Sequence, residues 1–166
     1  MIPYAPRVRT VGIDPGLRLT GYAVLDVEPA GGRAGVVEAG VFRFDPAASV
    51  ADRLVELERD LLELIERTRP DHAAVEAVYA HGAHPMTGVV MGHARGVVLL
   101  TCRRSGLPIT ELPPTEVKKS ITGNGHAKKA QVQAAVATVL KLPVAPEPPD
   151  VADAMAIALC AGTRTG

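Results

Sequence analysis

Cysteine is scarce in this 166-residue chain, which contains only Cys102 and Cys160, far apart and outside any C-x-x-C pair. Two such residues do not suggest a disulfide framework or a zinc site. Net charge is also missing, because 18 basic residues balance 18 acidic ones. A neutral chain has no global attraction for nucleic acid or for acidic partners, so any polyanion site must come from local clustering.

Long apolar segments are missing as well. The N-terminus lacks a basic segment followed by an apolar one, which argues against a signal peptide. The most apolar region, 86–102, is interrupted by His93 and Arg95 and is too polar to span a bilayer. We therefore expect a cytoplasmic protein with no membrane partner. Its length and its 47% apolar content predict a single domain over residues 1–166 with a substantial core.

The first half of the chain predicts three strands and a helix. The stretch 7–16 is typical of a buried strand that ends at Asp14 and is followed by a turn. Apolar runs at 22–27 and 34–44 predict two more strands, joined by short connections into an antiparallel meander. Leucine and isoleucine at spacings of three and four predict a helix over 50–68, which Ser49 can cap.

The second half alternates short strands with helices. Strands are predicted at 72–78 and 108–112, and helices at 86–105, from 113 onward, at 127–140 and at 150–162. This order predicts an α/β fold with a five-stranded mixed sheet flanked by helices, in which three antiparallel strands are followed by two parallel ones.

The predicted helix at 86–105 carries glycines at positions 88, 92 and 96, all on one stripe. Each glycine costs about 1 kcal/mol relative to alanine inside a helix, so the stripe needs a physical reason. Close packing on a sheet or on another helix would supply one. That packing could lie inside the monomer or at an interface between two copies of the chain.

Four carboxylates stand at element ends or in otherwise apolar segments: Asp14, Glu76, Asp150 and Asp153. Each has an ordinary alternative, because Asp14 can start a turn, Glu76 can lie on an edge strand, and the last two can cap a helix. All four could also converge on one edge of the sheet. Clustered carboxylates repel one another unless a cation is present, and oxygen-only clusters select Mg²⁺ or Mn²⁺. Two such ions suit metal-dependent phosphodiester hydrolysis.

Two lysine pairs, at 118–119 and 128–129, flank a Gly-Asn-Gly loop whose backbone N–H groups could approach phosphate. Lys119 and Lys128 are most simply solvated helix ends. His81 and His84 lack a third metal ligand, which favours a loop that faces DNA or solvent.

Seven segments, taken in order, resemble the RuvC-type Holliday junction resolvases. They are 12–16 with 20–22, 75–79, 92–96, 117–119, 123–125, 129–132 and 150–156. The first segment alone is weak, since actin-like ATPases begin similarly, but the seven together are highly specific and cover nearly the whole chain.

The resemblance implies a ribonuclease H-like fold and a homodimer with two symmetric sites. It further implies an endonuclease that resolves four-way DNA junctions by paired nicks, leaving 5′-phosphate and 3′-hydroxyl ends, in DNA recombination and repair. The branch-migration proteins RuvA and RuvB are the expected partners. Two Mg²⁺ or Mn²⁺ ions per site are the expected cofactors.

The resemblance also assigns individual residues. The catalytic and metal-binding positions of the family match Asp14, Glu76, Asp150 and Asp153, and the expected DNA contacts are Lys118, Lys129, Tyr79 and Arg95. The chain departs from the family at three places. Tyr79 stands where many members have Phe and keeps a face that can stack on a base. His93 stands where Gln is usual, and Asp150 where some members have His.

Two other functions stay open at this point. An actin-like or sugar-kinase lobe would use an aspartate at a strand end and a Gly-rich turn to hold ATP phosphate, although two such lobes do not fit in 166 residues. A non-catalytic junction-binding subunit would share the DNA contacts and lack the nicking activity.

Overall fold

The computed structural model describes residues 7–29, 33–77 and 85–164. Its strands and helices, in chain order, are β1 (Val8–Asp14), β2 (Leu19–Val27), β3 (Ala34–Arg43), α1 (Val50–Thr68), β4 (His72–Glu76), α2 (Pro85–Arg104), β5 (Ile109–Leu112), α3 (Pro114–Thr122), α4 (Lys129–Val139) and α5 (Pro149–Gly162). The predicted elements are therefore present, with ends shifted by a few residues. The Ser49 cap is confirmed, since the Asp52 N–H donates to the Ser49 hydroxyl at 3.0 Å.

The strands form one mixed sheet in the order β3-β2-β1-β4-β5. The first three strands pair antiparallel, whereas β4 runs parallel to β1 and β5 runs parallel to β4. This arrangement confirms the predicted five-stranded mixed sheet. It also shows that β4 is an interior strand, so the interpretation of Glu76 as an edge-strand residue is wrong.

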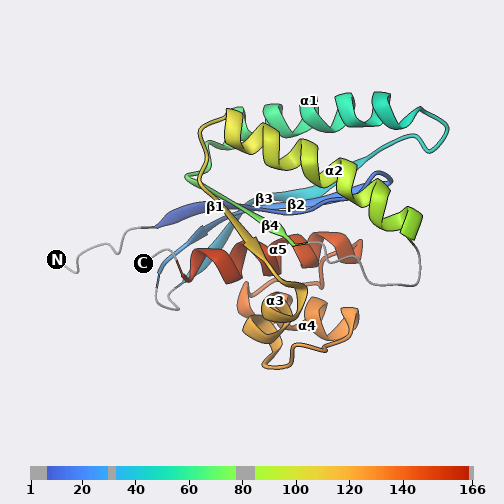
Figure 1. The fold of residues 1–166 in the computed structure, drawn as a ribbon. Helices are drawn as coiled ribbons and strands as arrows, with labels where there is room; N and C mark the ends of the chain where they lie inside the picture. The colour runs from blue at the N-terminus through green and yellow to red at the C-terminus, as the bar shows by residue number, and fades with distance from the viewer. Residues whose placement is uncertain (1–6, 30–32, 78–84, 165–166) are drawn as a thin grey trace.

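Helices cover both faces of the sheet (Figure 1). Helices α1 and α2 lie side by side on one face, and α5 lies on the other, with α3 and α4 packed against the outer side of α5. Because side chains alternate along a strand, Val11 and Ile13 of β1 point into the core beneath α1 and α2. Gly12, between them, faces α5.

Helix α5 lies directly on the backbone of the sheet. A Cβ atom added at Gly12 would come within 2.3 Å of the carbonyl oxygen of Ala154, and one added at Gly21 within 2.2 Å of the carbonyl oxygen of Asp150. A glycine inside a strand often marks such an approach of another backbone. The two glycines therefore set how closely the start of α5 approaches β1 and β2.

The glycine stripe of α2 packs against no other part of the chain that the structure describes. A Cβ added at Gly88, Gly92 or Gly96 would meet no heavy atom within 4 Å among the described residues. The expectation of close packing within the chain is therefore wrong for this part of the molecule. The stripe instead belongs to an exposed helix face that also carries Met86, Val89 and Leu100. None of the helices in the described ranges is long and apolar enough to cross a membrane.

Candidate active site

Strands β1 and β4 place Asp14 and Glu76 next to each other. The strands are parallel, with Ile13 opposite Val75, so the residues that follow end neighbouring strands at the same edge of the sheet. Ile13 and Val75 point into the core beneath α1 and α2. By alternation, Asp14 and Glu76 point toward the opposite face, where α5 lies.

The first turn of α5 brings Asp150 and Asp153 to the same place. Gly21 is opposite Asp14 in the register of β1 and β2, and it also touches the backbone of Asp150. Asp153 is three residues farther along the helix and lies on the same face. The alternative role for this pair, helix capping, is wrong, because the N-cap residue is Pro148 and no side chain caps the helix.

The electrostatics of the four carboxylates agree with this convergence. Burial, together with the charges of the other three carboxylates, raises the pKa of Asp14 to about 8. Burial, followed by the charge of Asp153, raises the pKa of Glu76 to about 7. The pKa of Asp153 is raised as well, mainly by burial. Burial and mutual repulsion thus disfavour the ionised forms of these carboxylates, and a bound cation would stabilise those forms.

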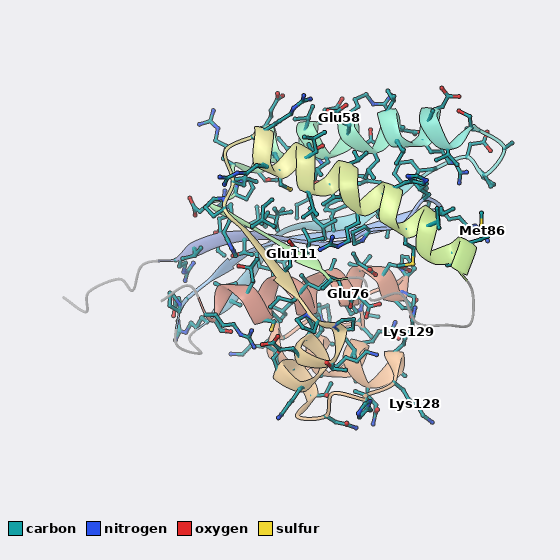
Figure 2. The ribbon with its side chains drawn as sticks, in the orientation of Figure 1. Glu58, Glu76, Met86, Glu111, Lys128 and Lys129 are labelled. Carbon is teal, nitrogen blue, oxygen red and sulfur yellow. The ribbon has the colours of Figure 1, made fainter. Side chains whose placement is uncertain are left out.

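Two lysines face the carboxylates, and they are the two that the family resemblance selects. The charges of Lys118 on α3 and Lys129 on α4 oppose the raised pKa values of Glu76 and Asp153. The charge of Lys129 also opposes the raised pKa of Asp14. The charge of Lys129, and not that of its neighbour Lys128, is among those that act on Glu76 (both lysines are labelled in Figure 2). A basic pair therefore borders the acidic cluster.

The donor set fits a hard divalent ion, since four carboxylates supply only oxygen ligands, which Mg²⁺ and Mn²⁺ prefer. Within the described residues, no three carboxylate, imidazole or thiol groups are grouped closely enough to ligate one ion as they stand. The strand and helix ends that carry the four carboxylates nevertheless converge.

The remaining predicted site residues have different outcomes. Arg95 donates from Nε to the carbonyl oxygen of Glu76, at 3.2 Å, and pairs with Glu111. Its contact with DNA stays a prediction. Tyr79, with His81 and His84, lies outside the described residues.

Sequence reasoning gave no role to Glu111 or to Gly21. Gly21 could have been suspected because it interrupts an apolar strand. Nothing in the sequence pointed to Glu111, whose side chain lies on a short strand and is 51% exposed.

The raised carboxylate pKa values predict that the metal-free protein loses stability as the pH rises. An acid with a pKa of about 8 when folded, against 3.8 normally, binds more protons in the folded state than in the unfolded state. Ionising this carboxyl group therefore costs the folded state stability. The loss is absent below pH 3.8 and grows until the pH passes the pKa of the folded state. We expect the Tm in EDTA to fall by roughly 10 °C between pH 5 and pH 8.

Differential scanning calorimetry checks this pH dependence. Mg²⁺ should raise the Tm more at pH 8 than at pH 5, because protons compete with the ion for the same oxygens. The Asp14→Asn variant should show a flatter Tm profile in EDTA. A wild-type profile that rises from pH 5 to pH 8 would contradict the prediction.

The sequence matches known proteins over nearly its whole length. The profile of the family described as "Crossover junction endodeoxyribonuclease RuvC" matches residues 10–161. A protein of that name from Pelotomaculum thermopropionicum is 45% identical over 150 residues, covering 90% of each chain. Another, from Rhodopirellula baltica, is 46% identical over 150 residues, which cover 90% of this chain and 83% of that one.

Solved structures show the same similarity in three dimensions. The structure described as "T. thermophilus RuvC in complex with Holliday junction substrate" superposes with a TM-score of 0.84, at 33% identity and over 92% of each chain. A second structure of Thermus thermophilus RuvC gives a TM-score of 0.80, at 34% identity and over 91% of each chain.

Proposed function

Because the chain belongs to the RuvC family of crossover junction endodeoxyribonucleases, whose fold is ribonuclease H-like, we propose that it resolves four-way DNA junctions by paired, symmetric nicks. The observation that carries the proposal is the convergence of the four carboxylates, Asp14, Glu76, Asp150 and Asp153, beside two lysines at one edge of the sheet. An acidic cluster with a basic border is the arrangement that metal-dependent cleavage of a phosphodiester needs.

Each group in the site has a role in this proposal. Two Mg²⁺ or Mn²⁺ ions, when bound, would supply activation of the attacking water and stabilisation of the leaving 3′-oxygen. The four carboxylates would hold these ions. Lys118 and Lys129 hold the phosphate backbone of the cleaved strand. Cleavage of the bond between the phosphorus and the 3′-oxygen leaves a 5′-phosphate and a 3′-hydroxyl.

The lysines should contribute mainly to DNA affinity. Replacing Lys129 with alanine removes one phosphate contact, so the slope of log binding constant against log salt should become shallower by about one. Lys128→Ala, at the N-cap position directly before Lys129, is the matched control, because the charge of Lys128 is not among the causes that shift the pKa of Asp14, Glu76 or Asp153. Fluorescence anisotropy of a labelled junction in EDTA measures both slopes, and equal slopes for the two variants would contradict the assignment.

The exposed face of α2 suits a second copy of the chain. Its glycines cost helix stability and gain no contact inside the described monomer, while Met86, Val89 and Leu100 expose apolar surface beside them. A close approach by another protein chain would account for both features. A symmetric dimer would present two carboxylate clusters to a four-way junction, whose arms are themselves related by a two-fold axis.

A nicking assay tests the whole proposal. A synthetic four-way junction, labelled on each strand in turn, is incubated with the protein and Mg²⁺ or Mn²⁺, and linear duplex of the same sequence serves as the control. We expect nicks at symmetric positions in two opposing strands and none in the duplex. Junction binding without nicks would favour a non-catalytic binding subunit, and equal cleavage of duplex would contradict junction selectivity.

Sedimentation velocity of the same sample tests the dimer. Partnership with RuvA and RuvB and a cytoplasmic location stay predictions.

A further inference from the structure

Arg95, on α2, connects the candidate active site to the edge of the sheet. Its Nε donates a hydrogen bond to the backbone carbonyl of Glu76 at 3.2 Å, and its guanidinium pairs with the carboxylate of Glu111 on β5. The arginine side chain is only 18% exposed, against 51% for Glu111. The guanidinium is therefore held largely by protein groups, and one of its contacts is to the main chain of a proposed metal ligand.

The direction of the Glu76 carbonyl follows from the next residue. The N–H of Ala77 donates to the carbonyl of Leu112 on β5, at 2.8 Å. Successive residues of a strand point their backbone groups to opposite sides. The backbone groups of Glu76 consequently point the other way, toward β1.

The strand β1 has no donor to offer that carbonyl. Ile13 is opposite Val75, and in a parallel ladder each bonding residue contacts the residues on either side of its partner. The next pair in this register would be Asp14 and Glu76. The carbonyl of Glu76 would then accept from the N–H of the residue after Asp14, which is residue 15. Residue 15 is Pro15, which has no N–H. The Nε of Arg95 takes the place of the missing ladder donor.

We propose that Arg95 is a positioning residue that fixes the end of β4 so that the Glu76 carboxylate stays beside Asp14, and that Glu111 holds the guanidinium for this task. The inference rests on the proposed function, because it treats Glu76 as a metal ligand. It gives Arg95 a role that differs from the DNA contact predicted from the sequence. Removing a group that orients a metal ligand through a hydrogen bond typically weakens metal binding by about 10- to 100-fold.

Metal binding without DNA or turnover is the readout that tests this role. Mn²⁺ is titrated calorimetrically into the DNA-free wild-type protein and its Arg95→Met variant, well below the Tm of each. We expect Arg95→Met to bind Mn²⁺ about tenfold more weakly and to bind a labelled junction in EDTA with unchanged affinity. Glu111→Gln should weaken Mn²⁺ binding in the same direction. Arg103→Met, at the exposed end of the same helix, is the control and should change neither affinity.

The opposite results would overturn the inference. If Arg95 contacted DNA, Arg95→Met would weaken junction binding in EDTA, while Glu111→Gln would strengthen it by releasing the guanidinium. A merely structural role would lower the Tm of Arg95→Met and leave its Mn²⁺ affinity unchanged. A wild-type protein that binds Mn²⁺ and nicks junctions, together with an Arg95→Met variant of equal Mn²⁺ affinity, would refute the positioning role alone. A wild-type protein that neither binds Mn²⁺ nor nicks junctions would refute the proposed function as well.

Discussion

Asp14→Asn should abolish junction cleavage while leaving junction binding intact. Asp14 is the last residue of β1 and lies beside Glu76 at the end of the neighbouring parallel strand. It is also opposite Gly21, whose backbone is in close contact with the start of α5. Asparagine keeps the shape and removes the anionic oxygen that would ligate the ions. We expect nicking to fall by at least about a thousandfold, which corresponds to roughly 4 kcal/mol of lost transition-state stabilisation.

The measurement separates chemistry from binding and from folding. Nicking of a labelled four-way junction is followed at saturating protein, and affinity is measured separately in EDTA. The same change made at Asp60, on α1 across the sheet from the cluster, is the control and should leave the nicking rate unchanged. Asp14→Asn should also melt at a higher temperature than wild type at pH 8 without metal, since it removes a charge that burial disfavours. Undiminished cleavage by this variant would remove Asp14 from the mechanism.

The sequence predicted the sheet and the position of its carboxylates because both depend on local patterns. Apolar alternation marked the strands, and Asp14 and Glu76 each stood at the end of one. Parallel strands place such ends together, so the position of these two side chains follows once β1 and β4 are neighbours. Which strands are neighbours is a property of the whole fold, and for that reason the pattern alone left Glu76 with an edge-strand interpretation.

Other features depended on contacts that no local pattern contains. Asp150 has a position and chemistry that suit a helix cap, yet the helix begins one residue earlier, at Pro149, so Asp150 lies in its first turn and does not cap it. The α2 glycines suggested close packing, but a Cβ added at any of them would meet no atom of the other described residues within 4 Å. The bond from Arg95 to Glu76 joins residues 19 apart in the sequence. It supplies a donor that Pro15, which directly follows β1, lacks. Each case required three-dimensional neighbours to resolve it.

Gly21→Ala should damage the site from a position that carries no functional group. The added Cβ would lie 2.2 Å from the carbonyl oxygen of Asp150 and 3.2 Å from its Cβ, so β2 and the start of α5 must separate. Because Asp14 remains on β1 while Asp150 and Asp153 move with the helix, the four carboxylates no longer converge. A displacement of about 1 Å in a catalytic group can cost roughly a hundredfold in rate, and overpacking of this kind typically costs about 1–3 kcal/mol of stability.

A second glycine of the same sheet provides the matched control. A Cβ added at Gly35, in β3, meets no heavy atom of the described residues within 4 Å, so Gly35→Ala makes the same chemical change without displacing a helix. We expect Gly21→Ala, assayed well below its Tm, to lose about a hundredfold in nicking rate and to bind Mn²⁺ more weakly. Gly35→Ala should match the wild type in both measurements. A Gly21→Ala variant that melts early but nicks at the wild-type rate would show that the approach of α5 to β2 serves the fold alone. Full loss of nicking with unchanged Tm and Mn²⁺ affinity would instead place Gly21 in contact with the DNA.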